Sequence, residues 1–288
     1  MWCAFSAPII LKVFGKDSQR YLNARLSNDS RSVSAGGSYE AAALTAQGRI
    51  EGHFHVMCMA EGDYLLFCEG GDRNAVRSAF SRYIVADRVT VTDLSDEWKA
   101  FVVAPTTGEL AEISTIASQL GAVVIHAPVL SESSAFILCS SVSSAELLAT
   151  VIRISGSELS EEQFNFKRAE RGVPFFPSEL NESVMLTESG LTNAVSFTKG
   201  CYVGQEVVER SDAIGKVPRL LQRITYECEK EPETGTAIKA TDGSEIGKVV
   251  SSYRAPEANR YISFCLLRNG RFHRGDAVTI GEISAHVM

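Results

Sequence analysis

The chain has 288 residues, of which 45% are hydrophobic and 22% are charged, and its formal net charge is −7. This balance is ordinary for a globular protein, no apolar run reaches the roughly 18 residues of a membrane-spanning helix, and the acidic surplus argues against nucleic-acid or membrane partners. The seven cysteines are odd in number and lack CxxC spacing, which disfavours disulfides and a zinc site. We therefore expect a cytoplasmic protein with reduced thiols, in which the cysteines of apolar runs are buried: Cys58, Cys68, Cys139 and Cys265.

Strand-like and helix-like patterns alternate in the first 95 residues. Apolar runs separated by glycine-containing turns predict strands at 9–14, 39–45, 50–60, 64–68 and 89–91. Helices are predicted from Asp17 to Leu26 and over 72–86. This part of the chain is therefore predicted to be a mixed α/β unit.

The middle section repeats this alternation on a smaller scale. Strands are predicted at 100–104, 123–126 and 135–139, and helices over 109–120 and 143–152. This β-α-β-β-α order is the split unit of a ferredoxin-like domain. In the last 70 or so residues, regular turn signals separate short strands, which predicts a small β-barrel: 221–228, 237–240, 246–252, 261–267 and 277–280.

The segment KGCYVGQE, residues 199–206, places one cysteine between two glycines. The glycines indicate a backbone that turns sharply or approaches another chain segment closely. A nearby cation lowers the pKa of a thiol and favours its reactive thiolate form. For Cys201, the candidate cations are Lys199 and, on a following helix, Arg210. The alternative is that the cysteine is a buried turn residue, and that Gln205 and Glu206 cap a helix.

Two further segments carry dense polar residues. In RAERGVP, residues 168–174, a glutamate between arginines is able to accept two parallel N–H donors, such as those of a pterin; a surface ion-pair cluster is the alternative, and the residues alone favour it. In QGRIEGHFH, residues 47–55, strand alternation places Glu51 on one face with His53 and His55. Because no third ligand is visible, we predict a half-exposed strand and no metal site.

In this order, the three segments resemble the YgfZ family of folate-binding proteins, which are similar to the aminomethyltransferase (T-protein) of the glycine cleavage system. Residues 199–206 match the family signature. Residues 45–50 and 170–174 match its flanking segments, and 247–251 resembles a strand motif of its C-terminal barrel.

The resemblance implies an α+β fold, with ferredoxin-like α/β units around a central channel that holds tetrahydrofolate, plus a small C-terminal β-barrel. Residues 1–95 together with 163–212 would form the folate-binding domain, 96–162 a ferredoxin-like middle domain, and 213–288 the barrel. Family members act in the assembly or repair of iron–sulfur clusters, including those of enzymes that thiolate tRNA.

The resemblance also assigns roles to individual residues. Cys201 and Lys199 are expected to carry the chemistry, and Glu170 is expected to orient the pterin. The remaining residues expected to contact folate, its glutamate tail or the cysteine loop are Phe164, Arg168, Tyr202, Gln205, Glu206 and Arg210.

One departure from the T-protein pattern affects the expected activity. The strand on which T-proteins carry an Asp-Asp pair reads Gly52-His53 here. Methylene transfer from an amine needs a carboxylate near the reacting nitrogen, and Glu51 is one residue from Gly52, a shift that points it to the other face. We therefore do not expect a conventional aminomethyltransferase.

We therefore expect a monomeric, tetrahydrofolate-binding factor for iron–sulfur cluster assembly or repair, which holds a cluster at most transiently. Its partners would be folate and client or assembly proteins. The alternatives are a folate-dependent one-carbon (aminomethyl) transferase, and a folate-binding scaffold in which Cys201 is only structural.

Overall fold

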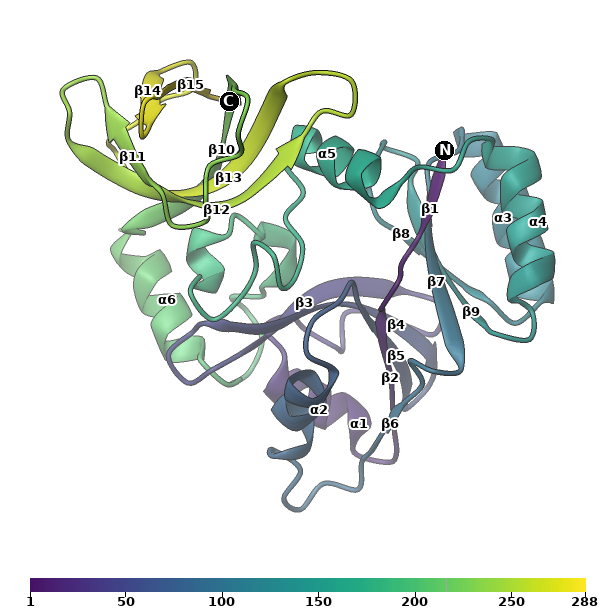
Figure 1. Ribbon diagram of the computed structural model, residues 1–288. Coiled ribbons are helices and arrows are strands. Elements are labelled where there is room, and N and C mark those ends of the chain that lie inside the picture. The colour runs from purple at the N-terminus through teal and green to yellow at the C-terminus, as the bar shows by residue number, and fades with distance from the viewer. Residues whose placement is uncertain (216) are drawn as a thin grey trace.

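The computed structural model describes residues 1–215 and 217–288 and has three parts that meet at the centre of the molecule (Figure 1). Two antiparallel sheets carry helices, and a closed six-stranded barrel lies at the C-terminal end. The predicted α+β fold class is confirmed. Among the described helices, none combines the length and apolarity needed to cross a bilayer.

The first part is a five-stranded sheet in the order β3-β4-β5-β2-β6. Its helices lie on one face, where Phe54 of the sheet packs edge-on against Phe80, with 5.2 Å between ring centroids. The predicted helix over 72–86 ends at Ser81. The elements are β2 (Ile9–Phe14), α1 (Ser18–Arg25), β3 (Ser38–Leu44), β4 (Ile50–Ala60), β5 (Asp63–Cys68), α2 (Arg73–Ser81) and β6 (Thr90–Asp93).

A bulge at the start of β4 changes the direction of one predicted side chain. Leu44 pairs with Ile50 while the preceding Ala43 pairs with Gly52, so Glu51 is the extra residue. Its carboxylate turns to the helix side of the sheet and pairs with Arg25 and with Arg82. The prediction that Glu51 shares a face with the two histidines of β4 is therefore wrong, because strand alternation is interrupted at the bulge.

The second part is a four-stranded sheet in the order β1-β7-β9-β8. The predicted β-α-β-β-α order is present, and the N-terminal strand β1 pairs antiparallel with β7 as an edge strand that the sequence analysis did not predict. Residues 2–4 thus belong to the second sheet, although the expected domain division places residues 1–95 in the folate-binding domain. The elements are β1 (Trp2–Ala4), β7 (Trp98–Val103), α3 (Thr107–Gln119), β8 (Val123–His126), β9 (Ala135–Ser140) and α4 (Ser144–Ser155).

The third part is the barrel, in the order β10-β13-β12-β11-β14-β15. The predicted range 213–288 contains residue 216, which lies outside the described residues. The barrel contains a last strand, β15, that was not predicted. Its strands are β10 (Arg219–Glu227), β11 (Ala237–Ala240), β12 (Glu245–Arg254), β13 (Arg260–Arg268), β14 (Ala277–Ile280) and β15 (Ile283–Val287).

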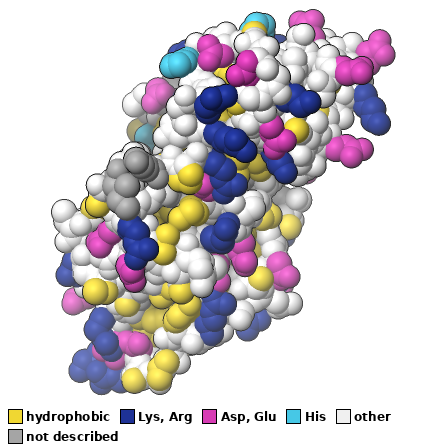
Figure 2. Space-filling view, turned by 90° about the vertical axis from the view of Figure 1, so that its left-hand side faces the viewer, with side chains coloured by type: hydrophobic (Ala, Val, Ile, Leu, Met, Phe, Trp, Pro, Cys, Tyr) yellow, Lys and Arg dark blue, Asp and Glu magenta, His cyan; other side chains and the backbone are white. Residues whose placement is uncertain are grey.

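The segment between the second sheet and the barrel runs through the centre of the molecule. It contains α5 (Glu161–Arg171), the short 3-10 helices Leu186–Glu188 and Thr192–Ala194, and α6 (Gln205–Ile214). α5 lies between the second sheet and the barrel (Figure 1). α6 lies below the barrel at the left of this view, near one end of β3. On the face that carries α6, charges of both signs are interspersed with hydrophobic side chains (Figure 2).

Candidate functional site

Cys201 is the exposed cysteine of this protein. Five of the other six thiols are buried, among them the four predicted to be so, and Cys228 is partly exposed. The alternative interpretation of Cys201 as a buried turn residue is therefore wrong. A thiol that is open to solvent is available to a partner molecule, whereas a buried one is not.

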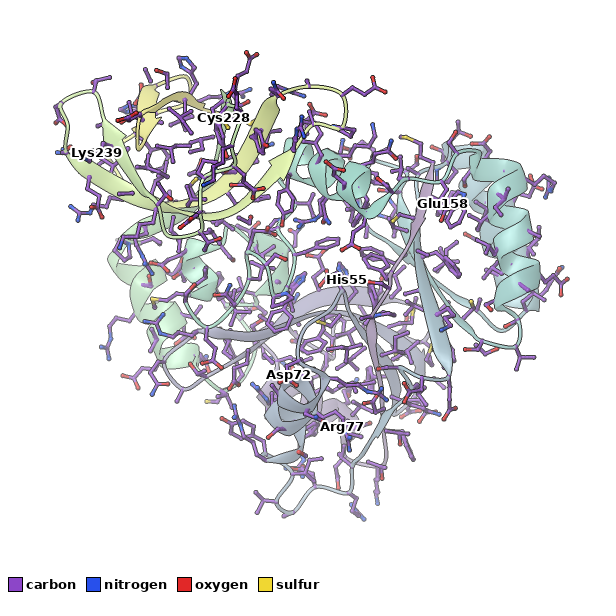
Figure 3. All side chains as sticks on the ribbon, viewed as in Figure 1. His55, Asp72, Arg77, Glu158, Cys228 and Lys239 are labelled. Atoms are coloured by element: carbon purple, nitrogen blue, oxygen red, sulfur yellow. The ribbon has the colours of Figure 1, made fainter. Side chains whose placement is uncertain are left out.

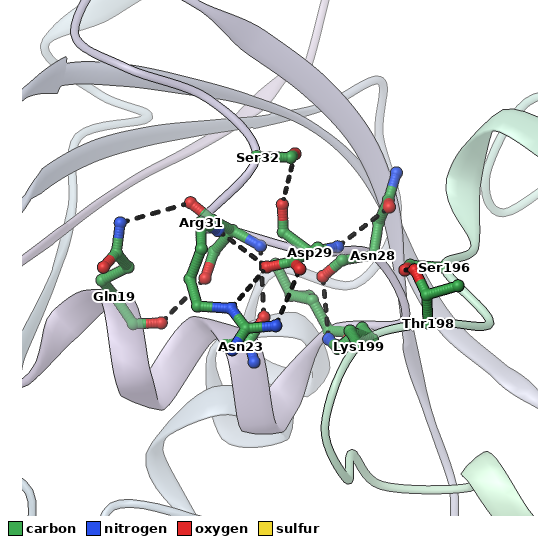
Figure 4. Close-up of polar contacts among 11 residues, drawn as sticks. Gln19, Asn23, Asn28, Asp29, Arg31, Ser32, Ser196, Thr198 and Lys199 are labelled. Atoms are coloured by element: carbon green, nitrogen blue, oxygen red, sulfur yellow. Dashed lines mark hydrogen bonds and ion pairs between the residues drawn. The ribbon is translucent and has the colours of Figure 1, made fainter.

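The residues on either side of Cys201 are held by α1 and by the segment that follows it. The Lys199 ammonium is buried and donates to the carbonyls of Leu26 (2.6 Å) and Asn28 (2.8 Å), as Figure 4 shows for Asn28. Its burial lowers the pKa of Lys199 to about 8. The ammonium also lies 4.8 Å from the ring centre of the buried Tyr202. Lys199 thus anchors the loop, and its donors are directed toward backbone carbonyls.

The second glycine of the signature is required by its surroundings. Gly204 has a φ of +84°, and a Cβ at this position would lie 2.5 Å from the carbonyl oxygen of Thr45. Both predicted reasons for a glycine are confirmed here, whereas Gly200 has open space around it. The Val203 N–H donates to the Ala24 carbonyl at 3.2 Å. The signature therefore packs directly on the 45–50 segment, and Cys201 is displayed from a loop with fixed flanks.

The polar residues after Gly204 bond with one another. The Tyr202 N–H donates to Gln205 Oε1 at 3.1 Å, and Gln205 Nε2 donates to Glu209 at 2.6 Å. Glu206 and Arg210 form an exposed i,i+4 ion pair. Gln205 therefore stabilises the turn into α6, while Arg210 is paired on the outer surface of that helix.

Arg168, which the sequence analysis assigned to folate, belongs to a buried ionic network. Its guanidinium donates to Glu179 at 2.8 Å, and the two side chains are 1% and 0% exposed. It also donates to the Tyr253 hydroxyl at 2.6 Å. Glu179 accepts further hydrogen bonds from the Ser251 hydroxyl and the Phe175 N–H. Because Ser251 and Tyr253 lie on β12, the network joins α5 to the barrel.

Glu170 and Phe164 do not contact the centre of the molecule either. Glu170 lies at the surface, and Phe164 lies in the hydrophobic core. The Glu170 carboxylate is half-exposed and pairs with Arg260 of β13 at 2.8 Å, where it borders a surface hollow between α5 and the barrel. Phe164 is buried between Phe5 and Phe175, with ring centroids 5.7 and 5.6 Å away. Their predicted contacts with folate stay predictions.

A cavity of about 380 Å³ lies where the three parts meet. The 168–174 segment reaches it through Arg171 to Pro174, and β10 contributes Leu221 to Arg223. None of the nine predicted site residues, all of which the structure describes, lines it. The other lining residues are Glu40, His53, His55, Glu69, Ala127, Pro128, Val129, Phe175, Ser189, Gly190, Leu191, Phe264 and Met288.

Two histidines and two glutamates form one end of this cavity, near the labelled His55 in Figure 3. Glu69 Oε1 lies 3.3 Å from His55 Nε2 and 3.6 Å from His53 Nδ1. Glu40 lies 3.9 Å from the other ring nitrogen of His53 and 3.8 Å from that of His55. Burial alone would raise the pKa of Glu69, but the adjacent imidazoles outweigh it and lower that pKa to about 2. The pKa of His53 is raised, because both carboxylates outweigh its burial.

This cluster follows from strand register, which the sequence analysis did not use. Glu40 of β3 is paired with His55 of β4. His55 is paired with Phe67 of β5, so continuing the antiparallel register by two residues places Glu69 opposite His53. The missing signal was therefore the pairing of the hairpin around Glu61 and Gly62, which would have identified a third potential ligand.

No protein-family model matches the chain. The human mitochondrial iron–sulfur cluster assembly factor IBA57 is 26% identical over 283 residues, which cover 90% of this chain and 76% of that protein. The tRNA-modifying protein YgfZ of Klebsiella pneumoniae is 23% identical over 244 residues, 80% of this chain and 73% of that protein. A chloroplastic Arabidopsis thaliana protein named as a transferase is 29% identical over 115 residues, and the matched part is 40% of this chain and 26% of that longer protein.

The fold is also that of a solved structure, aminomethyltransferase T of the Bartonella henselae glycine cleavage system. The TM-score is 0.84 at 15% sequence identity, and the match covers 99% of this chain and 84% of that one. A likeness at this identity establishes architecture and not activity. In sequence the chain is similar to the iron–sulfur cluster assembly factor IBA57 and to YgfZ proteins, and its fold is that of aminomethyltransferase T.

Proposed function

We propose that this protein is a tetrahydrofolate-binding factor for the assembly or repair of iron–sulfur clusters, and that Cys201 is its reactive residue. The observation that carries the proposal is the exposed thiol on a loop whose two flanks are fixed. The homologues named for iron–sulfur cluster assembly and for tRNA modification support this direction and point to tRNA-modifying enzymes among the clients. The site of action would be the cytoplasm.

Ligand number limits what Cys201 does alone. Iron–sulfur clusters are held by about four side-chain ligands, mostly cysteine thiolates, and Cys201 contributes one. A client or assembly protein would supply the others, so this protein would hold a cluster only while the two are in contact. The exposed position of Cys201 suits such a shared and transient ligand, because a partner has direct access to the thiol.

The central cavity fits folate in size and polarity. Its volume of about 380 Å³ lies within the range of roughly 300–1,000 Å³ of small-molecule sites. Carboxylates lie at one end, where they suit the N–H donors of a pterin, and Arg171 and Arg223 supply positive charge for the glutamate tail. Val129, Phe175 and other apolar residues form walls for the rings. Bound tetrahydrofolate would supply a reduced pterin that carries one-carbon units.

The test is complementation of cells that lack this protein, with the activity of a cluster-dependent tRNA-thiolating enzyme as the readout. We expect wild type and Cys228→Ala to restore thiolated tRNA, and Cys201→Ala to fail although it accumulates to the same level. Cys228 is the matched control because it is the other thiol that is not fully buried. Full restoration by Cys201→Ala would contradict the assigned role.

A further inference from the structure

The two histidines and two glutamates of the cavity form a cluster with unfulfilled bonding capacity. Among the described residues, both ring nitrogens of His53 and the Glu69 oxygen Oε2 are buried without a hydrogen-bond partner. His53 and Glu69 are 3% and 7% exposed. Burying polar atoms without partners is costly, so this arrangement indicates that a further species completes their bonding.

The spacing of the donor atoms matches that around a metal ion. One ligand atom from each of His53, His55 and Glu69 can be chosen so that all three lie within 4.8 Å of one another. Glu69 Oε1 is 3.3 and 3.6 Å from the facing nitrogens of the two histidines. Two ligand atoms that each lie about 2.1 Å from a tetrahedral ion are about 3.4 Å apart. Both histidine–Glu69 pairs already have this spacing, and the two histidine nitrogens, which lie within 4.8 Å of each other, would move to about the same distance on binding one ion.

We propose that His53, His55 and Glu69 bind one divalent first-row transition-metal ion, with its remaining coordination positions open to the central cavity. Two imidazoles and one carboxylate suit ions such as Fe²⁺ and Zn²⁺, whereas Mg²⁺ and Ca²⁺ prefer all-oxygen sites. A site with three protein ligands and an open position is typical of ions that contact a small molecule. This inference goes beyond the proposed function and does not depend on Cys201. Because the ion would engage Glu69, a carboxylate that the proposed function offers to the pterin, its test uses folate-free protein.

Glu40 is the carboxylate that faces the second nitrogen of each histidine ring. Each imidazole directs one nitrogen toward Glu69, and its other nitrogen faces Glu40 at 3.9 Å for His53 and 3.8 Å for His55. Metal-binding histidines generally donate their second N–H to a carboxylate, which fixes the ring orientation. At these distances Glu40 forms no hydrogen bond with either ring, so it would fix both rings only by closing to about 3 Å when the ion binds.

The test is a calorimetric titration of folate-free protein with Zn²⁺, and anaerobically with Fe²⁺. A Cys201→Ser/Cys228→Ser background removes the two accessible thiols. We expect one ion per chain in this background and in the control His273→Gln, whose imidazole is 86% exposed. His55→Gln or Glu69→Gln should lower the affinity by more than the about 10- to 100-fold that loss of an outer-shell partner costs, and Glu40→Gln should lower it within that range.

A substitution at a buried position can prevent folding, so a second measurement uses no such substitution. The zinc-loaded Cys201→Ser/Cys228→Ser protein is studied by X-ray absorption at the zinc edge. A first shell with two imidazoles is expected. No binding up to millimolar metal, binding unchanged in His55→Gln and Glu69→Gln, or a shell without imidazole would each overturn the proposal. None of these results changes the expected phenotype of Cys201→Ala, so the failure of either proposal is recognised separately.

Discussion

Replacing Arg168 by methionine tests whether this residue is structural, as its contacts indicate, or binds folate, as the sequence predicted. Methionine fills part of the space but removes the cation from Glu179, which is 0% exposed and keeps only neutral donors. Breaking a buried pair by removing one partner costs about 3–5 kcal/mol. This is a large part of the about 5–15 kcal/mol that stabilises a typical domain.

The assay is urea unfolding followed by far-UV circular dichroism. With an m-value of about 3 kcal/mol/M, the midpoint should fall by about 1–1.7 M. Lys167→Met is the matched control, because Lys167 precedes Arg168 on α5, is partly exposed, and should change stability by no more than about 0.5 kcal/mol. Equal midpoints for the two variants, together with weaker tetrahydrofolate binding by Arg168→Met alone, would refute the structural role and restore the sequence-based prediction.

Three further predictions concern the proposed folate cavity, the buried Arg25–Glu51 pair and the buried Lys199 ammonium. In a tetrahydrofolate titration, Arg171→Gln should lower the affinity about 10-fold or more, as expected for a lost charge-assisted hydrogen bond. The control Glu170→Gln, on the same helix, should leave the affinity unchanged. The reverse result would place the ligand beside Glu170. Glu51→Gln should destabilise the fold by about 3–5 kcal/mol, because Arg25 is 1% exposed and loses its carboxylate; a stable variant that loses folate-dependent turnover would instead favour the one-carbon transferase. Lys199 has a pKa lowered to about 8, so the folded state releases its proton at lower pH than the unfolded state. The stability of wild type relative to Lys199→Met should therefore rise between about pH 8 and pH 10.5, and a constant difference across that range in urea unfolding would contradict this.

The parts of the fold that were predicted correctly depend on short-range patterns. The strands 9–14, 50–60, 123–126, 237–240 and 277–280 were predicted with the bounds that the structure has. Their apolar runs are bounded by turn residues, and both signals lie within a few positions. The strand β1 was missed because its three residues form a strand only by pairing with β7, about 100 residues away.

The candidate site was likewise predicted correctly only where the signal is local in the sequence. Cys201 was singled out as the thiol that packing does not explain, and a sharp turn was expected at the glycines beside it, because a glycine-flanked thiol is a local signal. Three predicted folate residues on α5 lie outside the cavity: Phe164 and Arg168 are buried, and Glu170 pairs with Arg260 at the surface. The direction of a side chain from a helix depends on what the helix packs against, and α5 itself was not predicted.

By itself, the sequence determined the fold class, most strands, and the position of an unusual cysteine, because these depend on residue type and local spacing. Only the tertiary structure decided which polar residues share a site. Strand register brings Glu40 and Glu69 to His53 and His55, a bulge turns Glu51 away from them, and burial pairs Arg168 with Glu179. These are contacts between segments far apart in the chain, and their geometry depends on how the three parts pack.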